Sequence, residues 1–430
     1  MRRTSVIAGV AALGLALAAC GGDDGGNGSS DGGGDGGGGG DVEVFTWWAE
    51  GSEKAGLDAL VGVFDEQNPD FTFVNGAVAG GAGSNAKNVL ASRLQTNDPP
   101  DTFQAHAGKE LSDYIAAEQL QDISGLYEEN GWNDIFPADL LELLTVDDAI
   151  YSVPSNIHRA NVVWANPAVL EEAGIDPATP PATLDDWFAQ LDAVKATGKT
   201  ALSVATDWTQ VHLLETVLLA DLGPEAYIGL WDGSTDWTSA EVQGAVDDYA
   251  KLLSYTNTDR QNLDWPDATQ QIIDGAAAYN VMGDWAEAAF QEQQQVLGTD
   301  YVAFPVPGSD GVFDFLADSF TLPVGAPNED GTRAWLSTVA SAEGQEAFNL
   351  AKGSIPARTD VDASAYPEYQ QTAIESWTND TIVPSLAHGA ATPIAWLTDI
   401  TSAVSQFSAT GDVEALKTGL ADAAEKNQEG

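Results

Sequence analysis

The 430-residue chain has a single cysteine, so no disulfide bond can form within it. Its four histidines, at positions 106, 158, 212 and 388, include no pair at a metal-binding spacing such as HxxxH. Glycine-rich runs such as AGGAGSN are not followed by the GK[ST] of a phosphate-binding loop, and no GxSxG nucleophile turn occurs from residue 42 onward. These absences predict a protein without a metal site, a cofactor or a catalytic motif.

Basic residues are also scarce. Sixteen Lys and Arg stand against 66 Asp and Glu, which gives a formal net charge of -50 at pH 7. Such a surface repels nucleic acid and anionic lipid, helps to keep a protein soluble and suits salty surroundings that screen its charges. We expect no nucleic-acid partner. With so many acids, the spacing of two carboxylates does not identify a glycosidase pair.

The N-terminal segment has the pattern of a secretion signal. Arg2 and Arg3 precede the apolar run VIAGVAALGLALAA, which is too short to span a bilayer comfortably. The run ends in LAAC, which resembles the lipobox of bacterial lipoproteins, in which Cys20 becomes the lipidated first residue after cleavage. We therefore expect residues 1–20 to be a lipoprotein signal peptide and the protein to face outward from the cell membrane on a lipid anchor. An ordinary signal peptide with a stray cysteine is the alternative.

Residues 21–41, GGDDGGNGSSDGGGDGGGGGD, are predicted to be a flexible tether. Glycine and serine lose much conformational entropy when they are ordered, and they bury almost nothing in return. A random coil of this length reaches on the order of 25 Å from its attachment point. The tether would hold a folded domain near the bilayer and leave it free to reorient.

The remaining residues, about 390, are too many for one core and suit two lobes. Short β-like runs alternate with amphipathic helical stretches, which predicts an α/β fold with a largely parallel sheet. The segment AIYSVPSNIH is predicted to leave the first lobe as a strand, and FLADSFTLPVG to return to it. We expect the first lobe to comprise residues 42–152 with about 306–326, and the second 153–305 with about 327–430.

Several separated motifs in this order resemble one family. FTWWAEG, IYSVPSNIHRANVVW, AAAYNVMGDWA, LADSFTLP, AFNLAKGSIPAR and SLAHGA are similar to segments of the extracellular solute-binding proteins of ABC sugar importers, closest to those that take glucose, galactose or mannose. The resemblance implies a two-lobed periplasmic-binding-protein-like fold (type II), with lobes discontinuous in sequence and joined by a hinge. It also implies a monomer that captures a monosaccharide between its lobes and delivers it to the permease subunits. An oligosaccharide-binding protein and a secreted glycoside hydrolase are the alternatives.

Candidate binding residues follow the predicted strands. Ligands of open α/β sheets bind at the carboxyl ends of the strands, where Trp47, Trp48, Gln104 and His106 fall. Gln104 and His106 are two residues apart and so face the same way, whereas the neighbouring indoles face opposite ways. The resemblance assigns Trp48 to sugar contact and leaves Trp47 to fill the end of the strand.

Other candidates rest mainly on the resemblance. Asp318 is expected to accept hydrogen bonds from two hydroxyls, and Lys352 to donate to a hydroxyl or pair with Asp318. Trp265, favoured over Trp285, would supply an aromatic wall from the second lobe, and Asp284 would contact the ligand or cap a helix. The expected binding residues are Trp48, Gln104, His106, Trp265, Trp285, Asp284, Asp318, Lys352 and His388. His158, Arg159, Gln210 and His212 are interpreted as lobe or hinge structure that could also line the floor of the cleft.

Overall fold

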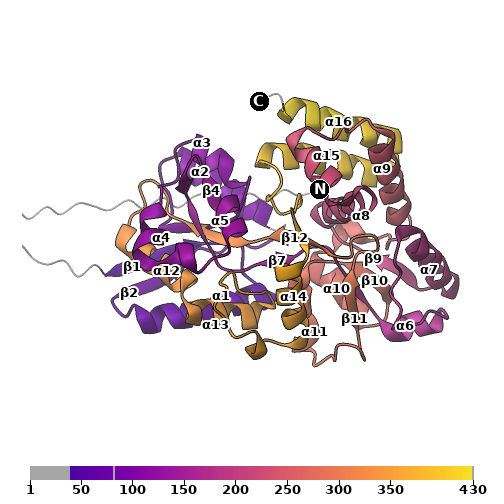
Figure 1. Cartoon of the computed structure of the whole chain (residues 1–430), viewed down its shortest axis with the longest axis horizontal. Coiled ribbons are helices and arrows are strands. Elements are labelled where there is room, and N and C mark those ends of the chain that lie inside the picture. The colour runs from indigo at the N-terminus through magenta and orange to yellow at the C-terminus, as the bar shows by residue number, and fades with distance from the viewer. Residues whose placement is uncertain (1–38, 81–82, 429–430) are drawn as a thin grey trace, which may run out of the picture. The chain divides into compact units, whose positions relative to one another are not determined.

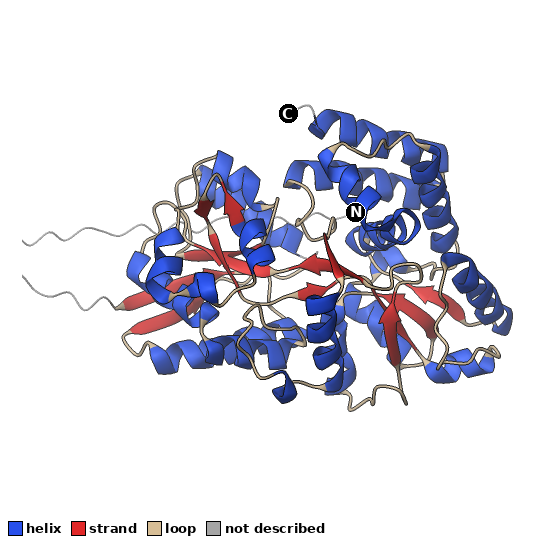
Figure 2. Ribbon diagram, in the orientation of Figure 1, coloured by secondary structure: helices blue, strands red, loops and turns tan. Residues whose placement is uncertain are grey.

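The computed structural model describes residues 39–80 and 83–428 and arranges them as two α/β lobes with a short sheet between them (Figure 1). Helices flank the strands in both lobes (Figure 2). The expected signal peptide, Cys20 and most of the expected tether lie outside the described residues, but the last two tether positions belong to strand β1. Within 39–80 and 83–428, no helix is long and apolar enough to cross a membrane. The predicted α/β class and two-lobed arrangement are confirmed.

The first lobe contains a five-stranded sheet in the order β2-β1-β3-β13-β6. Its strands are β1 (Gly40–Phe45), β2 (Phe71–Asn75), β3 (Thr102–His106), β6 (Ser152–Pro154) and β13 (Asp318–Thr321). Strand β1 pairs in parallel with β2 and β3, whereas β13 runs antiparallel to β3 and β6. The register of β13 sets Asp318 opposite His106 and Phe320 opposite Gln104. Segments far apart in sequence therefore meet at one end of this sheet.

Helices and a small hairpin cover this sheet. They are α1 (Gly51–Gln67), α2 (Ser84–Gln95), α3 (Leu111–Ala116), α4 (Ser124–Asn130), α5 (Ala138–Leu144), α12 (Glu329–Ala340) and α13 (Ala342–Lys352), with β4 (Thr145–Val146) and β5 (Ala149–Ile150). Residues 329–352 pack here, although we expected the chain after about 326 to join the second lobe. The reason is aromatic packing: Trp335 lies 5.3 Å from Phe64 of α1, and Phe348 lies 4.7 Å from Trp48, between ring centroids.

The second lobe contains a four-stranded sheet in the order β11-β8-β10-β9. Its strands are β8 (Val162–Ala165), β9 (Thr200–Ser203), β10 (Ala277–Val281) and β11 (Val302–Pro305). Its helices are α6 (Pro167–Glu172), α7 (Leu184–Thr197), α8 (Asp207–Asp232), α9 (Ala240–Leu253), α10 (Trp265–Ile273), α11 (Glu287–Glu292), α15 (Ile394–Thr410) and α16 (Val413–Gln428). Helix α8 is interrupted at Gly223, because the φ of 73° at this residue is incompatible with a right-handed α-helix.

A three-stranded sheet, β14-β12-β7, lies between the lobes (Figure 1). It comprises β7 (His158–Arg159), β12 (Val312–Leu316) and β14 (Thr381–Pro384), and α14 (Glu368–Asn379) packs Trp377 on Phe315 with ring centroids 5.3 Å apart. Only Ala317 separates β12 from β13 of the first lobe, and two residues separate β7 from β8 of the second. The candidate residues at 158 and 318 therefore stand where the chain passes from one lobe to the other.

Candidate functional site

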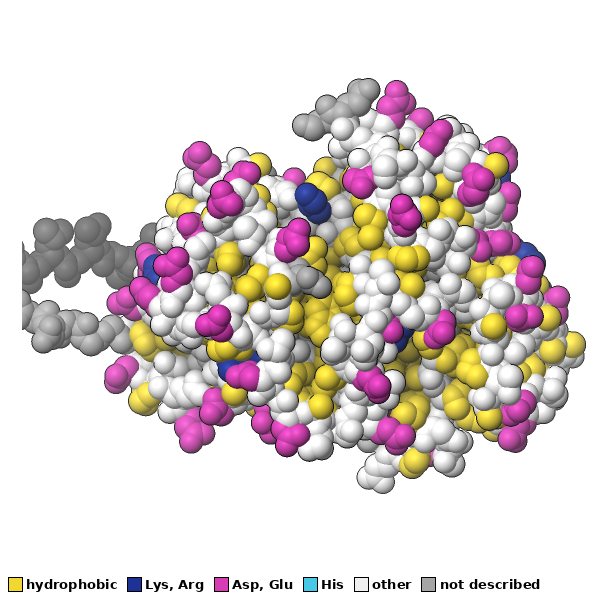
Figure 3. Space-filling model, viewed as in Figure 1, with side chains coloured by type: hydrophobic (Ala, Val, Ile, Leu, Met, Phe, Trp, Pro, Cys, Tyr) yellow, Lys and Arg dark blue, Asp and Glu magenta, His cyan; other side chains and the backbone are white. Residues whose placement is uncertain are grey.

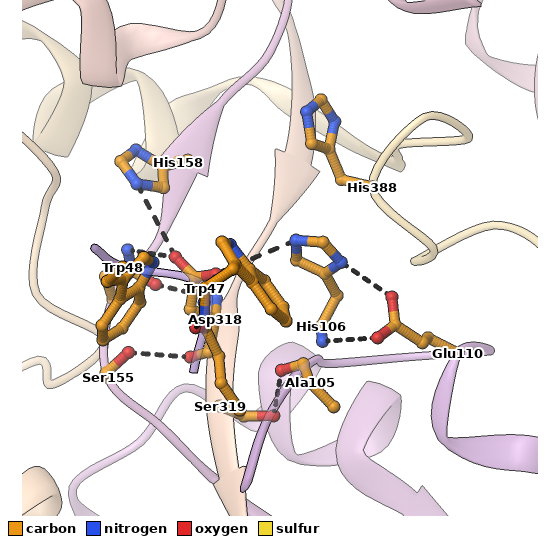
Figure 4. Close-up of polar contacts among 12 residues, drawn as sticks. Trp47, Trp48, Ala105, His106, Glu110, Ser155, His158, Asp318, Ser319 and His388 are labelled. Carbon is orange, nitrogen blue, oxygen red and sulfur yellow. Dashed lines mark hydrogen bonds and ion pairs between the residues drawn. The ribbon is translucent and has the colours of Figure 1, made fainter. Parts of the chain in front are cut away.

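A cavity of about 470 Å³ lies between the lobes and is lined by side chains from both. From the first lobe and the connecting segments come Trp47, Glu53, His106, His158, Asp318 and Lys352, and from the opposite side Trp208, Asp264, Trp265, Trp285 and His388. Figure 4 shows the imidazoles of His106, His158 and His388 around Asp318. Within the described part of the chain, no group of His, Cys, Asp and Glu side chains could hold a metal ion.

Asp318 is the most heavily bonded residue of the cavity. Its Oδ1 accepts from Gln104 Nε2 at 2.8 Å, and its Oδ2 accepts from Asn156 Nδ2 at 2.9 Å and from Lys352 Nζ at 2.8 Å. Burial alone would raise the pKa of Asp318, but the positive charge of Lys352, with the neighbouring His106 and His158, outweighs burial and holds the pKa below its ordinary value. Asp318 is therefore an ionised carboxylate in a fixed orientation.

His158 has a defined tautomer. Its Nε2 lies 2.8 Å from Lys352 Nζ, and because an ammonium group only donates, Nε2 must accept. The ring proton is then on Nδ1, which donates to Asp284, and Asp284 also accepts from the backbone N–H of Arg159 at 3.0 Å. Burial and the charge of Lys352 lower the pKa of His158. Asp284 is fully buried and does not line the cavity, so it orients His158 instead of meeting a ligand.

His106 is held from the side away from Asp318. Its Nδ1 lies 2.7 Å from Glu110 Oε2, which also accepts from Lys87 Nζ at 2.8 Å. Burial would raise the pKa of Glu110, but Lys87 and His106 outweigh it and lower that pKa to about 2. The Nε2 of His106 lies 3.8 Å from Asp318 Oδ1, and its ring centroid lies 5.0 Å from that of Trp47. The edge of the His106 imidazole and the indole of Trp47 therefore form one wall of the cavity.

The two neighbouring indoles occupy the reverse of the expected positions. Trp47 lines the cavity, whereas Trp48 is fully buried and packs on Phe348 and on Phe320, at centroid distances of 4.7 and 5.5 Å. The two side chains point to opposite sides, as predicted, although β1 ends at Phe45 and both lie in the turn that follows it. The side that carries Trp48 is closed by α13, so the prediction that Trp48 meets a ligand does not fit this arrangement.

Aromatic side chains also form the wall opposite Asp318. Trp265 begins α10, and the Asp264 carboxylate that caps this helix accepts from the Trp265 N–H at 2.8 Å and from Trp208 Nε1 at 3.4 Å. Trp285 lies 5.0 Å from His388 and 5.2 Å from His158 between ring centroids. Both Trp265 and Trp285 line the cavity, and so does Trp208.

Six of the nine predicted residues line the cavity: His106, Trp265, Trp285, Asp318, Lys352 and His388. Trp48, Gln104 and Asp284 do not. Gln104 is 3% exposed and accepts from Thr46 Oγ1 and from the Trp47 N–H while it donates to Asp318, so it holds other side chains in place.

Sequence reasoning missed Trp47, Glu53, Asn156 and Trp208. Trp208 and Glu53 stand at the starts of helices, where the search of strand ends did not look. Burial raises the pKa of Glu53 to about 7, although Lys352 opposes this shift. The cavity thus presents four indoles, the fixed carboxylate of Asp318 together with further acids such as Glu53 and Asp264, one ammonium group and three imidazoles, a set suited to a polar ring with apolar faces.

Relatives extend over most of the chain. An uncharacterized ABC transporter extracellular-binding protein of Pyrococcus horikoshii is 34% identical over 391 residues, which is 90% of this chain and 88% of the relative. A probable sugar-binding periplasmic protein of Mesorhizobium japonicum is 31% identical, with 85% and 88% covered. The xylose/arabinose-binding protein XacG of Haloferax volcanii is 31% identical, with 81% and 77% covered.

Solved structures share the fold. The bacterial solute receptor AcbH, described as having an exclusive preference for β-D-galactopyranose, gives a TM-score of 0.79 at 18% identity over 91% of this chain and 99% of its own. A chitin oligosaccharide binding protein gives 0.79 at 20% identity, with the same coverage. At these identities the likeness concerns the fold alone.

The family model described as bacterial extracellular solute-binding protein matches residues 48–346, which include Asp318 and the cavity indoles Trp208, Trp265 and Trp285 but not Trp47, Lys352 or His388. The relatives are solute-binding proteins and not enzymes. On the match of the family model and the extent of the relatives, the chain belongs to the bacterial extracellular solute-binding proteins.

Proposed function

We propose that the protein captures a monosaccharide of the glucose, galactose or mannose type in the cavity between its lobes and delivers it to the permease subunits of an ABC importer. The observation that carries the proposal is the joint presence of indoles and a fixed, ionised Asp318 in one interlobe cavity. The names of the relatives, which include a probable sugar-binding protein and a xylose/arabinose-binding protein, support the sugar class.

The indoles supply apolar contact. The C–H face of a pyranose ring can stack on Trp47, Trp208, Trp265 or Trp285, and each Å² of apolar surface that leaves water contributes about 25 cal/mol. Such stacking favours sugars as a class and discriminates weakly among epimers.

Asp318 and Lys352 supply the choice among hydroxyl groups. A carboxylate offers about four acceptor positions, and three are filled by Gln104, Asn156 and Lys352, so about one remains for a hydroxyl instead of the two that we expected. Lys352 has three donors and uses two. Hydrogen bonds to charged partners contribute roughly 1.5–3 kcal/mol each, and a sugar that lacks the matching hydroxyl leaves the buried partner unsatisfied.

Closure of the lobes is the mechanism we infer. The ligand contacts both lobes and stabilises the closed form by its additional contacts there, and the permease recognises that form. We further propose that the protein acts as a monomer, outside the cell membrane, on a lipid attached at Cys20.

A second candidate is an oligosaccharide. A further cavity, of about 1220 Å³, shares Trp208 and Asp264 with the first and extends along α15 through Ile394, Leu397 and Thr401. A chain of sugar rings could continue past Trp208 into this space. The structural neighbour that binds chitin oligosaccharides is compatible with this alternative.

Calorimetry with D-glucose, D-galactose, D-mannose, D-xylose and maltotriose tests both candidates. We expect one hexose to bind and to change tryptophan emission, and the Asp318→Asn variant to bind it more than tenfold more weakly, or about 1.4 kcal/mol. The matched control Asp310→Asn changes an exposed aspartate outside the cavity and should retain the affinity. Tighter binding of maltotriose than of any monosaccharide would favour the second candidate, and no binding of any of the five sugars would overturn both.

A further inference from the structure

A chain of three buried polar groups leads from the interior to the cavity. Glu215 of α8 is fully buried, and both of its carboxyl oxygens lie 3.1 Å from Ser385 Oγ. Ser385 Oγ lies 2.8 Å from Nδ1 of His388. The backbone N–H of Ala387 donates to Glu215 Oε2 at 2.8 Å. We call Glu215, Ser385 and His388 the Glu215 relay.

The cavity end of the relay is a buried nitrogen atom without a protein partner among the described residues. His388 is 4% exposed, it lines the cavity, and its Nε2 has no hydrogen-bond partner among the described residues. Burial, together with His212, His106, His158 and Lys87, lowers the pKa of His388, so its ring is neutral. A neutral imidazole carries one proton, either on Nδ1 or on Nε2. The identity of the protonated nitrogen decides whether a ligand meets a donor or an acceptor.

Among residues 39–80 and 83–428, no Lys or Arg forms an ion pair with Glu215 at the other end of the relay. His212 Nε2 lies 4.0 Å from Glu215 Oε1, but it donates to the carbonyl of Ala160 at 2.8 Å, and burial lowers its pKa to about 4. Its ring is therefore neutral. Tyr227, on the same helix, donates to the carbonyl of Pro384.

Strands β12 and β7 contribute the remaining charges. Asp314 of β12 is fully buried, and neither of its carboxyl oxygens has a partner among the described residues. Burial and the negative charge of Glu215 raise the pKa of Asp314 well above its ordinary value, and Arg159 of β7 opposes this shift. Burial raises the pKa of Glu215 to about 8, so Glu215 is largely protonated at neutral pH.

We propose that the protonation state of Glu215 sets the polarity of His388 toward the ligand, which makes Glu215 a specificity-determining residue that never touches the sugar. With Glu215 protonated, its Oε1–H donates to Ser385 Oγ, Ser385 donates to Nδ1, and Nε2–H of His388 is a donor in the cavity. With Glu215 ionised, Ser385 donates to the carboxylate, Nδ1–H donates to Ser385, and Nε2 is an acceptor.

The exchange between the two states releases one proton. The proton of Glu215 passes to Ser385, that of Ser385 passes to Nδ1, and the proton on Nε2 leaves to the cavity. No other bond changes. The relay therefore gives a buried carboxyl group a route to solvent through the binding site.

Long-range ¹H–¹⁵N spectra of the protein with ¹⁵N-labelled histidine test the relay without any sugar. We expect His388 to change from the Nε2–H to the Nδ1–H tautomer as the pH rises from 6 to 9.5, with a midpoint near the pKa of Glu215. The His388→Gln variant assigns the resonances. A His388 ring that keeps one tautomer over this range would overturn the proposal, whether or not the protein binds a sugar.

Two variants isolate the cause. Glu215→Gln has the same shape, and its amide group donates permanently to Ser385, so His388 should remain Nε2–H at every pH. Ser385→Ala removes the middle of the relay, and the tautomer should no longer follow Glu215. A tautomer change that persists in both variants would assign the titration to another group and reject the role of Glu215.

The consequence for specificity rests on the proposed function. A sugar hydroxyl both donates and accepts, so it suits either state, whereas fluorine only accepts. With D-glucose and its 2-, 3-, 4- and 6-deoxyfluoro derivatives as probes, we expect one derivative to lose at least tenfold more affinity than glucose between pH 6.5 and 9. In Glu215→Gln this extra loss should disappear. Equal losses of affinity for glucose and for every derivative would show that His388 forms no hydrogen bond with a hydroxyl group of the ligand.

Discussion

Individual residues in the cavity are held by partners that a ligand does not touch. Asp284 fixes the tautomer of His158, Glu110 orients His106, and Gln104 holds Asp318. The ligand therefore meets groups whose geometry is already set, which lowers the entropy lost on binding. Lys352, with the neighbouring His106 and His158, keeps Asp318 charged in a place where burial alone would protonate it.

At the residue scale, the two neighbouring indoles should behave differently when truncated. We expect Trp47→Ala to weaken sugar binding at least tenfold, because a stacking face is lost, and to retain a cooperative unfolding transition. Trp48→Ala should lower the free energy of unfolding by about 3–5 kcal/mol, because it leaves a cavity beside Phe348 and Phe320. Calorimetry and urea unfolding of both variants measure these effects, and an unchanged affinity of Trp47→Ala would contradict the assignment.

The sequence predicts which residues lie near this site. It predicts less well which of their side chains point into the cavity. Alternation along a strand predicts that Trp47 and Trp48 diverge, and they do so just beyond the end of β1, but the side that faces the cavity depends on where α13 packs. Trp208 was missed because it lies in the first turn of a long helix and not at a strand end. His158 was left open because its role comes from contacts with Lys352 and Asp284, which are distant in sequence.

At the scale of elements, the contact of α13 with α1 delivers Lys352 to the cavity. A Cβ atom at Gly56 of α1 would lie 3.0 Å from the Cβ of Lys352 and 3.1 Å from the ring of Phe348. Glycine thus allows the two helices to approach closely at this point. Such an approach is not visible in the local sequence, since Gly56 looks like any helical glycine.

The Gly56→Ala variant tests the importance of this approach. We expect the added methyl group to push α13 away, to destabilise the protein by roughly 1–3 kcal/mol and to weaken sugar binding through the shifted Lys352. Gly62→Ala, on the same helix, meets nothing within 4 Å and should instead stabilise by roughly 0.5–1 kcal/mol. Thermal unfolding and calorimetry compare the pair, and equal behaviour of the two variants would argue against a special role for Gly56.

The pairing of elements also limits what the sequence could predict. The alternation of strands and helices predicted the α/β class, and strand-end reasoning found His106. The antiparallel register that sets Asp318 opposite His106 joins segments with no local link, so only the family resemblance suggested Asp318. The boundary of the second lobe was placed too early because the aromatic residues of α12 and α13 bury against the first lobe.

At the scale of the whole molecule, the surface is strongly acidic. Figure 3 shows Asp and Glu side chains scattered over the visible face, with few Lys and Arg among them. A net charge of -50 opposes close approach to an anionic bilayer, so charge alone would not hold the protein at a membrane. An attachment through lipid is consistent with such a surface, because acyl chains bind through burial of apolar area.

Cell fractionation of the full chain and of the Cys20→Ala variant tests the anchor. We expect the unmodified chain in the membrane fraction and the variant in the soluble extracytoplasmic fraction, with unchanged sugar affinity. Cys20→Ala removes the only thiol and alters no described residue of the cavity. Recovery of both proteins from the soluble fraction would show that residues 1–20 act as an ordinary secretion signal.

The direct passage of β12 into β13 across Ala317 has a mechanical consequence. Asp318 stands beside this junction, and His158 stands at the neighbouring one, so groups that we propose to hold the ligand also lie at the hinge between the lobes. Residues near a hinge move little when the lobes rotate, whereas residues at the far ends of the lobes move a long way. Replacing one hydroxyl of the ligand at Asp318 would thus change the angle between the lobes. The resulting displacement would be largest at the far ends of both lobes, where a permease would contact them.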